Sequence, residues 1–263
     1  MNTIKHLFIK SDKDKQISQV AQIFNWSLLI FILIICSALA FNKLGYTTRW
    51  HTVYQYRYKF WIGFKMTIII SFFALFLSLL LGGFFAFAKN SKIILLNKLS
   101  IFYVGIIRGT PFLVQIFMGF YVIGTALNIT NRYVAGVLIL AIFSGAYVTE
   151  IIRAGIESIE TKQLEAAKSL GFTKWQTYRY IVMPQVIKRI IPPLAGQFIS
   201  LVKDSSLLSI IAVNEFTKNY QEVDSITFAM VENLVILAIG YLILTIPMSQ
   251  IAKILERKFN YET

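Results

Sequence analysis

The sequence predicts an all-α membrane protein, a polytopic helical bundle of about six spans. Hydrophobic residues make up 56% of the 263-residue chain and charged residues only 15%, with a mean hydropathy of +0.64, whereas a soluble domain needs more charge on its surface. Five long runs also lack Asp, Glu, Lys and Arg, and about 20 apolar residues cross a bilayer core of roughly 30 Å as a helix. These runs are residues 20–42, 66–88, 109–131, 133–149 and 233–250.

Six helical spans are expected from these runs and their flanks. The fifth is the least regular, because it begins at a proline pair (192–193) and carries a Lys-Asp pair (203–204) near its far end. The expected spans are residues 25–44, 60–88, 97–124, 132–154, 190–213 and 229–252.

The distribution of Lys and Arg predicts the orientation. With the N-terminus inside, 17 of the 26 basic residues lie in inner segments, 6 in outer segments and 3 within spans. Basic loops on one side of the membrane therefore explain the net charge of +13, which would otherwise suggest nucleic acid as a partner. The same distribution places the polar stretch between the fourth and fifth spans in the cytoplasm.

The first span allows two interpretations. A basic start, an apolar run and the sequence SALA at 37–40 resemble a secretory signal with its cleavage site. The long leading segment, which contains Asp12 and Asp14, and the length of the apolar run favour a retained membrane anchor instead. Cleavage would leave five helices with the N-terminus outside, and the polar stretch would be cytoplasmic in both cases.

The polar stretch 157–189 predicts two short helices joined at a glycine. Strong helix formers fill ETKQLEAAKS, and Gly171 suits the position that follows a helix end. Thr173 and Gln176 have the spacing of a capping box that opens a second helix, which Pro184 is expected to break. The result is a helix–Gly–helix element at the membrane surface, and pattern alone would favour an ordinary amphipathic surface helix.

Small and aromatic side chains suggest how this element is used. Ala166 and Ala167 leave a flat patch where another protein could approach closely. Trp175, Tyr178 and Tyr180 could seat the second helix at the membrane interface.

The residue sequence of this stretch resembles the EAA loop of ABC importer permeases, which has the form E-A-A-x3-G-x9-I-x-L-P. Six of the seven fixed positions match over 20 residues, and Met183 stands where leucine is usual. In that family the loop forms a coupling helix that docks in a cleft of the cytoplasmic ATPase subunit, so the resemblance implies an ATPase-coupling role. The matching residues are Glu165, Ala166, Ala167, Gly171, Ile181 and Pro184.

Stretches such as RGTPFLVQIF and GQFISLVKDSSLLSIIAV look like the polar amino acid importer branch of these permeases. The resemblance covers roughly 60–252 and implies an importer transmembrane domain at 59–255, with the coupling segment at about 157–189, and a cytoplasmic tail at 256–263. That branch commonly has five spans, so residues 1–58, with one membrane helix and an external loop, are an N-terminal extension of unknown purpose. The proline often found ahead of the EAA segment is missing here.

The resemblance also implies a function and partners. The chain would be a multi-pass permease subunit of the bacterial cytoplasmic (inner) membrane, with the EAA segment and C-terminus in the cytoplasm. It would move a polar amino acid by alternating access and would itself be no enzyme. An external binding protein would deliver the amino acid, and a second permease chain, identical or related, would complete the path. Two copies of a cytoplasmic ATPase subunit would carry ATP and Mg, and this chain would hold no cofactor.

Other classes of function fit the residues less well. The chain has no Gly-Lys dipeptide and therefore no Walker A loop, so a partner must hydrolyse ATP. A self-sufficient carrier would show repeated halves with matching broken helices, which the sequence lacks. A membrane enzyme would need clustered His, Cys or carboxylates, and the spacing of Cys36, His6 and His51 argues against a metal site.

Ionisable residues at membrane depth are costly, which makes Lys203 and Asp204 functional candidates. Successive helical residues point about 100° apart, so one could face a pathway while the other pairs elsewhere. An amino acid zwitterion offers a carboxylate to a lysine and an ammonium to an aspartate, and a structural ion pair between helices is the equal alternative. The resemblance implies that this neighbourhood, with Ser205, lies near the translocation path.

The RGTP turn at 108–111 is a second candidate. Gly109 and Pro111 should disturb the helix, and freed backbone groups at membrane depth are tolerated only where they are buried or line a cavity. Arg108 would otherwise lie alone in lipid. A structural kink is equally compatible with these residues, whereas the resemblance implies that Arg108, Thr110 and Pro111 lie near the translocation path.

Three charged residues share one helix face at the inner end of the fourth span. Glu150, Arg153 and Glu157 are spaced i, i+3 and i+7. The spacing favours an inner charge network that anchors the coupling segment, with a gate as the alternative.

Overall fold

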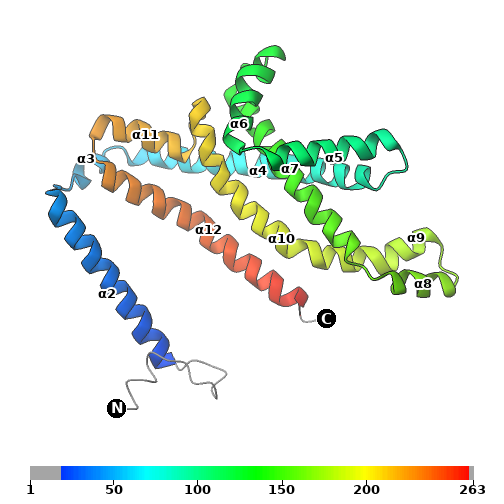
Figure 1. Ribbon diagram of the computed structural model, residues 1–263. Helices are drawn as coiled ribbons and strands as arrows, with labels where there is room; N and C mark the ends of the chain where they lie inside the picture. The colour runs from blue at the N-terminus through cyan, green and yellow to red at the C-terminus, as the bar shows by residue number, and fades with distance from the viewer. Residues whose placement is uncertain (1–18, 261–263) are drawn as a thin grey trace. The chain divides into compact units, whose positions relative to one another are not determined.

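The computed structural model describes residues 19–260 and separates the chain into two compact units, Met1–Thr48 and Arg49–Thr263. Residues 1–18, with the predicted basic start and His6, and 261–263, at the end of the predicted tail, lie outside the described part. The elements (Figure 1), with η for π- or 3-10-helical segments, are α2 (Gln19–Leu44), α3 (Trp50–Tyr54), α4 (Arg57–Lys89), α5 (Ile94–Gly109), α6 (Phe112–Phe117), η1 (Met118–Gly124), α7 (Arg132–Glu157), α8 (Thr161–Ser169), α9 (Lys174–Thr177), η2 (Tyr178–Val182), α10 (Met183–Asp204), η3 (Ser205–Ile211), α11 (Phe216–Thr227) and α12 (Met230–Asn260).

The prediction of an all-α membrane bundle is confirmed. Within the described residues, five helical stretches are long and apolar enough to cross a membrane, and a bent pair of helices makes a sixth if it is counted as one span. The five stretches are Gln19–Ala40, Arg57–Lys89, Arg132–Glu157, Lys174–Ile211 and Met230–Phe259.

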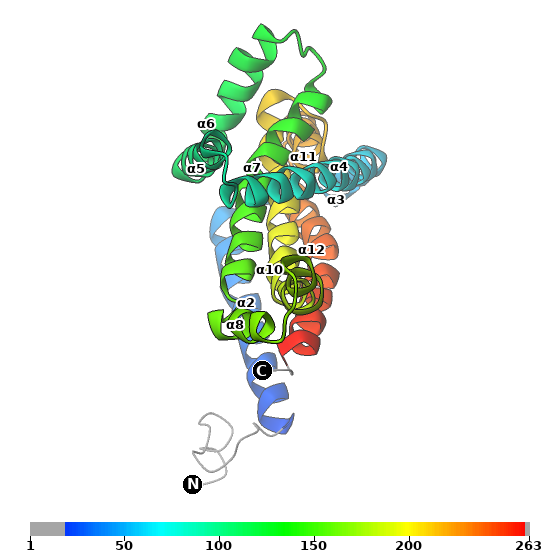
Figure 2. The same cartoon turned by 90° about the vertical axis from the view of Figure 1, so that its right-hand side faces the viewer.

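The third expected span, 97–124, is not one continuous helix. The chain bends by 112° between α5 and α6, and α6 turns away from α5 in Figure 2. Thr110 is extended, with φ −122° and ψ 149°, and Pro111 is the N-cap residue of α6. A proline disfavours the helical conformation for the residue before it, so the predicted disturbance at this turn is a complete break.

The predicted helix break at Pro184 is wrong. Helix runs without interruption from α9 through η2 into α10, so Pro192 and Pro193 lie inside it. The π-helical segment η2 ends at Val182, two residues before Pro184, and such a segment changes the backbone pairing where a proline withdraws its N–H group. Prolines are tolerated inside spans when neighbouring groups satisfy the freed carbonyls.

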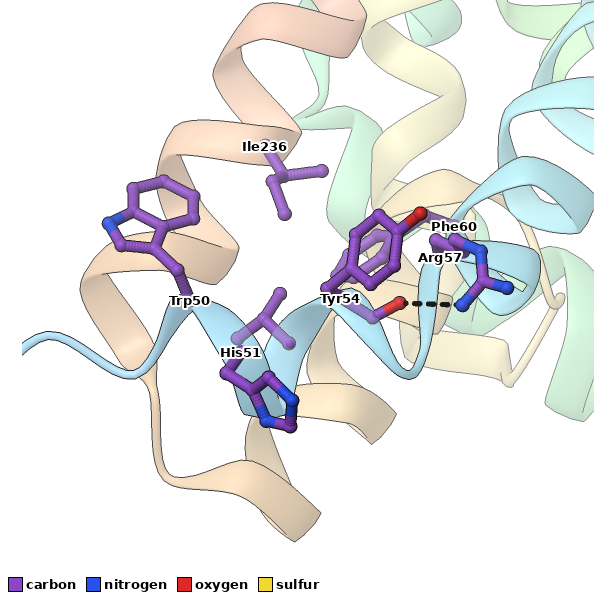
Figure 3. A pocket seen from close by; sticks show the side chains of 7 residues that line it. Trp50, His51, Tyr54, Arg57, Phe60 and Ile236 are labelled. Carbon is purple, nitrogen blue, oxygen red and sulfur yellow. Dashed lines mark hydrogen bonds between the residues drawn. The ribbon is translucent and has the colours of Figure 1, made fainter.

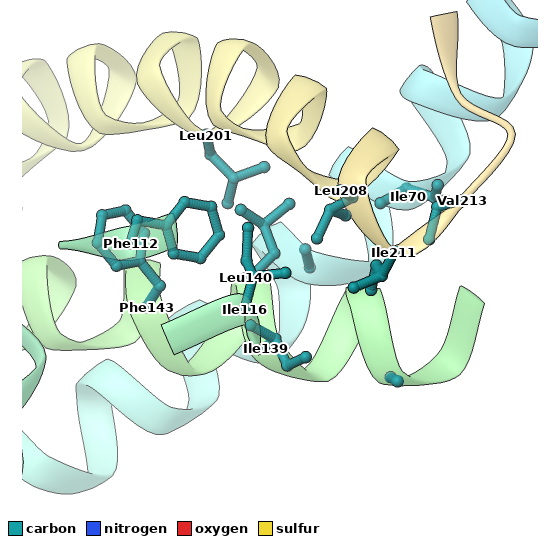
Figure 4. Close-up of a cluster of buried hydrophobic side chains, with 12 residues drawn as sticks. Ile70, Phe112, Ile116, Ile139, Leu140, Phe143, Leu201, Leu208, Ile211 and Val213 are labelled. Carbon is teal, nitrogen blue, oxygen red and sulfur yellow. The ribbon is translucent and has the colours of Figure 1, made fainter. Parts of the chain in front are cut away.

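The centre of the second unit is the contact between α4 and α7. Gly82 lies against Val148, and Lys89 reaches Glu150 farther along both helices, so the two helices run in the same direction. A Cβ atom on Gly82 would lie 2.4 Å from Cγ1 of Val148, which makes glycine a requirement for this close approach. The largest core cluster beside this contact (Figure 4) contains Ile70, Ala74, Phe112, Ile116, Ala135, Ile139, Leu140, Phe143, Leu201, Leu208, Ile211 and Val213.

A smaller core joins α3, α11 and the first halves of α4 and α12. It lies at the opposite end of this unit from α8 and α9 (Figures 1 and 2). Phe216 is its centre, with the ring of Phe64 edge-on at 5.7 Å. A Cβ atom on Gly240 of α12 would lie 2.1 Å from the Phe216 ring, so α12 approaches closely at this position.

Candidate functional site

The segment 157–189 contains the predicted helix–Gly–helix element, and α8 ends in a Schellman motif. The N–H of Phe172 donates to the carbonyl of Ala167, and the N–H of Gly171 donates to the carbonyl of Lys168, both at 3.0 Å. Gly171 has a φ of +80°, which glycine adopts without the steric cost of a side chain. The predicted use of this glycine after a helix end is confirmed.

The predicted capping box opens the second helix. The hydroxyl of Thr173 accepts the N–H of Gln176 at 3.3 Å, and the Gln176 side chain accepts the N–H of Thr173 at 2.8 Å. Two N–H groups at the helix start, which lack partners within the helix, are thereby satisfied. The turn between α8 and α9 is therefore specified locally, by three residues at fixed spacing.

Side-chain contacts fix both ends of this element to the membrane helices. The Gln185 amide donates to the Gln163 side chain at 2.8 Å, which ties α10 to α8. Arg189 donates to the carbonyl of Ser158 and, at 2.7 Å, to its hydroxyl, which ties α10 to the end of α7. A small apolar core lies beneath the element and contains Ile159, Val182 and Val186.

The exposed face of the element differs from the prediction at one residue. Ala167 is buried, so the expected flat patch lacks it, whereas Glu165 and Ala166 are exposed. Leu170 and Trp175 are 76% and 66% exposed. Tyr180 is exposed as well, whereas Tyr178 packs against the small apolar core beneath the element. The surface that a partner could contact is thus formed by the tip of the hairpin and one side of α8.

An ion-pair network lies on the C-terminal half of α7. One carboxylate oxygen of Glu150 is 2.9 Å from the Lys89 ammonium, and the other is 3.3 Å from Arg108 and 2.9 Å from Arg153. Arg153 also pairs with Glu157, so the predicted face of three charges is paired along its length. The network joins α4, α5 and α7 through a single carboxylate.

Sequence reasoning missed two members of this network, Lys89 and Arg108. Glu150 is the first acidic residue after Asp14, so Lys89 and Arg108 have no acidic residue nearer along the chain than Glu150. That deficit is the signal that could have predicted the pairing, although only the fold shows which cations reach Glu150. Arg108 also lies over the Tyr147 ring, 5.4 Å from its centroid, so it is not alone in lipid.

The break between α5 and α6 has its own hydrogen bonds. The Gln115 amide donates to the carbonyl of Ile107 at 2.7 Å and to the carbonyl and hydroxyl of Thr110 at 3.1 and 2.9 Å. One side chain therefore satisfies two carbonyls that the break frees from the helical ladder.

The Lys203–Ser205 candidate lies where α10 tightens into η3. Lys203 is exposed, Asp204 is half-buried, and the buried Ser205 hydroxyl donates to the carbonyl of Val202 at 2.7 Å. Within residues 19–260, no salt bridge joins Lys203 or Asp204 to another residue. The neighbours Phe112 and Leu201 belong to one core cluster (Figure 4), so the fold brings this candidate and the RGTP turn to the same cluster.

Comparison with known proteins agrees with this architecture. The glutamine transport system permease protein GlnP of Escherichia coli (strain K12) is 35% identical over 200 residues, which cover 75% of this chain and 91% of the relative. The probable glutamine ABC transporter permease protein GlnM of Bacillus subtilis (strain 168) is 37% identical over 198 residues, or 75% and 92% of the two chains. Both relatives are named as permeases and not as enzymes.

Solved structures show the same fold. The crystal structure of an amino acid ABC transporter with histidines superposes with a TM-score of 0.76 at 36% identity, and the match covers 81% of this chain and all of the other. An inward-facing MetNI methionine ABC transporter superposes with a TM-score of 0.54 at 19% identity over 77% of this chain and 97% of the other, which supports the fold alone. Residues 78–261 match the family model described as binding-protein-dependent transport system inner membrane component. The chain therefore belongs to the family of inner membrane components of binding-protein-dependent transport systems.

Proposed function

We propose that this chain is the membrane-spanning permease subunit of an ATP-driven importer that carries a polar amino acid into the cell. The observation that carries the proposal is the helix–Gly–helix element with the EAA pattern. Its base is held to α7 and α10, and its tip presents Leu170 and Trp175 together with Glu165 on α8. A rigid base with exposed large apolar residues suits docking of a soluble partner.

The proposed partners follow from the family. Two copies of a cytoplasmic ATP-binding subunit hydrolyse ATP, a second permease chain completes the pathway, and an external binding protein delivers the substrate. The excess of Lys and Arg in the segments on one side, 17 against 6, supports a cytoplasmic position for the EAA segment and the C-terminus. The membrane is then the bacterial cytoplasmic membrane.

The proposed substrate is glutamine, or a polar amino acid of similar size, because the permeases that are 35–37% identical carry that name. Its path would pass the RGTP turn (Arg108, Thr110, Pro111) and the Lys203–Ser205 stretch. At the Lys203–Ser205 stretch, two observations support this path over an ion pair between helices. Asp204 has no salt-bridge partner within residues 19–260, and both stretches adjoin one core cluster.

In the proposed mechanism, ATP binding closes the two ATPase subunits, and each docked α8–α9 element moves with its ATPase subunit. The Arg153–Glu157 pair and the contact of Arg189 with Ser158 connect this element to α7. Glu150 passes the displacement to α4 through Lys89 and to α5 through Arg108, since a well-paired carboxylate holds its partners in one geometry. The charge network thus acts as an anchor, and the membrane subunits rock between inward-facing and outward-facing states.

The test is the purified transporter complex, reconstituted in vesicles and assayed for ATP hydrolysis and for glutamine uptake. Glu165→Lys reverses the charge on the exposed side of α8, so we expect substrate-stimulated hydrolysis and uptake to be lost together while the chain stays in the membrane. Asp204→Asn should leave assembly and basal hydrolysis intact and lower uptake. Glu256→Lys makes the same charge reversal outside the coupling element and is the matched control.

Two outcomes would count against the proposal. Normal stimulated hydrolysis in Glu165→Lys would remove the docking role from α8. Loss of the assembled complex in Asp204→Asn would favour a structural partner for that carboxylate, because stranding a buried cation costs roughly 3–5 kcal/mol.

A further inference from the structure

A cavity of about 450 Å³ lies between α3, the start of α4 and the first half of α12, outside the regions proposed for coupling and transport. Cavities of roughly 300–1,000 Å³ are the size that holds small ligands. Figure 3 shows Ile236 pointing from α12 toward α3, with Trp50 on one side and Tyr54 and Arg57 on the other. The lining residues are Trp50, His51, Val53, Tyr54, Arg57, Phe60 and Ile236.

The cavity is apolar inside and carries a fixed cation at its edge. Arg57 donates to the carbonyl of Tyr54 at 3.2 Å, and its guanidinium lies 4.6 Å from the centroid of the Tyr54 ring. Lys59, two residues farther on, is paired with Glu222. Within residues 19–260, no carboxylate pairs with Arg57, so this guanidinium is held in place with its charge uncompensated.

The residues around the cavity are typical of the membrane–water interface. Trp50, Tyr54, Tyr58 and Trp61 are all about half exposed or more, and such amphipathic rings concentrate at the depth of lipid headgroups. The cavity also lies at the N-terminal ends of two membrane-spanning helices, α4 and α12. A ligand here must therefore have an apolar part at the depth of the acyl chains and a polar part at the headgroups.

We propose that this cavity binds one anionic phospholipid, with the upper part of an acyl chain against Phe60 and Ile236 and the phosphate on Arg57. Guanidinium and phosphate form bidentate, charge-assisted hydrogen bonds, and the uncompensated charge of Arg57 selects an anionic headgroup over a zwitterionic one. The aromatic rings of Trp50 and Tyr54 flank the glycerol region. The site stands independently of the proposed substrate and coupling roles, because it needs only that α4 and α12 cross the membrane.

The test measures lipid retention by native mass spectrometry of the purified full-length chain, with any subunits that co-purify, after titration with phosphatidylglycerol or phosphatidylcholine. We expect one phosphatidylglycerol to be retained in preference to phosphatidylcholine. Arg57→Gln should lower that preference about fivefold, because one basic residue near a lipid phosphate contributes about 1 kcal/mol to binding. Ile236→Trp, which fills the cavity and keeps the charge, should lower retention of both lipids.

Lys65→Gln is the matched control, because Lys65 is an exposed cation on the same helix that lies over Trp61 and outside the cavity. A general attraction between the basic surface and anionic lipid would fall equally in Lys65→Gln and Arg57→Gln, and that result overturns the proposal. Equal retention of the two lipids by the unaltered chain overturns the choice of an anionic headgroup. Retention of neither lipid overturns the site. Unchanged gel-filtration and thermal-unfolding profiles show that the variants are folded.

Discussion

Two membrane helices of similar apolar character, α7 and α12, are covered very differently. In the most apolar stretch of α7, 61% of the residues are buried inside the chain, whereas in α12 the share is 6%. Apolar length therefore identifies both as membrane helices without saying what surrounds them. The difference lies in residue size, since α7 is rich in small buried residues: Ala135, Gly136, Ala141, Ser144, Gly145, Ala146 and Thr149.

Small residues allow helices to approach closely. Dispersion contacts then hold the helices together, since lipid tails are as apolar as the side chains and give no hydrophobic driving force. In α12, among residues 230–259, the fully buried positions are Glu232, Asn233 and Gly240, and two of these are polar. The Tyr241 hydroxyl also donates to buried Glu215 at 3.2 Å. Thus α7 is held by close packing along its length, whereas α12 is attached at its first half by hydrogen bonds and by the close approach of Gly240 to Phe216.

The largest expected effect comes from breaking the close packing of α7. Gly82→Leu places a side chain where Val148 lies 2.4 Å away and the Gly145 carbonyl lies 3.0 Å away. Overpacking costs about 1–3 kcal/mol and occasionally more, and here a backbone atom is among the obstacles. We expect most of the chain to be lost as folded protein, as measured by detergent gel filtration and thermal unfolding.

The adjacent residue supplies the control for this change. A Cβ atom on Gly83 would have no neighbouring atom within 4 Å, so Gly83→Leu should leave the folded yield near that of the unaltered chain. Equal losses in both variants would mean that helix composition, and not the α4–α7 contact, determines stability.

The second effect concerns the polar attachment of α12 through Glu215, the N-cap residue of α11. Its carboxylate accepts the N–H groups of Thr217 and Lys218 at 2.8 and 2.7 Å, yet burial outweighs these bonds and raises its pKa from 4.5 to about 7. A raised pKa means that the folded state keeps the proton while the unfolded state loses it. Glu215 therefore makes its full contribution to the free energy of unfolding below about pH 4.5, and this free energy falls by about 3 kcal/mol as the pH rises to about 7.

Glu215→Gln keeps an oxygen acceptor at the helix start and cannot ionise. We expect this variant to keep its stability between pH 4.5 and 7, and to unfold at a higher temperature than the unaltered chain at pH 7.5. Glu256→Gln, which alters an exposed carboxyl on α12, should still lose stability between pH 4.5 and 7, as the unaltered chain does. The same pH slope in Glu215→Gln would show that another group is responsible.

Local sequence signals predicted the coupling segment well, because its structure is set by neighbours along the chain. Gly171 and the Thr173–Gln176 pair need only adjacent backbone groups, and both were identified. The position of Ala167 was mispredicted, because its burial depends on tertiary packing that a local pattern does not contain. Continuation of the helix past Pro184 was missed for the same reason, since neighbouring groups in the fold stabilise it.

Long-range pairing accounts for the remaining differences. Hydropathy identified the runs at 66–88 and 133–149 as membrane helices, but it gave no sign that the two helices contact each other at Gly82. The break at Thr110 was foreseen as a disturbance and became a 112° bend, because Gln115 compensates the freed carbonyls. Pairing of Arg108 with Glu150 joins residues 42 positions apart, which no helical period can predict.

The smallest expected effect is on the open face of α12. Ile243 is 59% exposed, and in the isolated chain Ile243→Ala should change stability by no more than about 0.5 kcal/mol. Gly240→Leu, on the face that meets the Phe216 ring, is the positive control and should be strongly destabilising. If a second permease chain covers the open face, Ile243→Ala should lower the stability of the assembled transporter while sparing the isolated chain. The two thermal-unfolding measurements together therefore decide between lipid and protein as the neighbour of α12, and an equal, large loss in both would mean that this face is already packed within the chain.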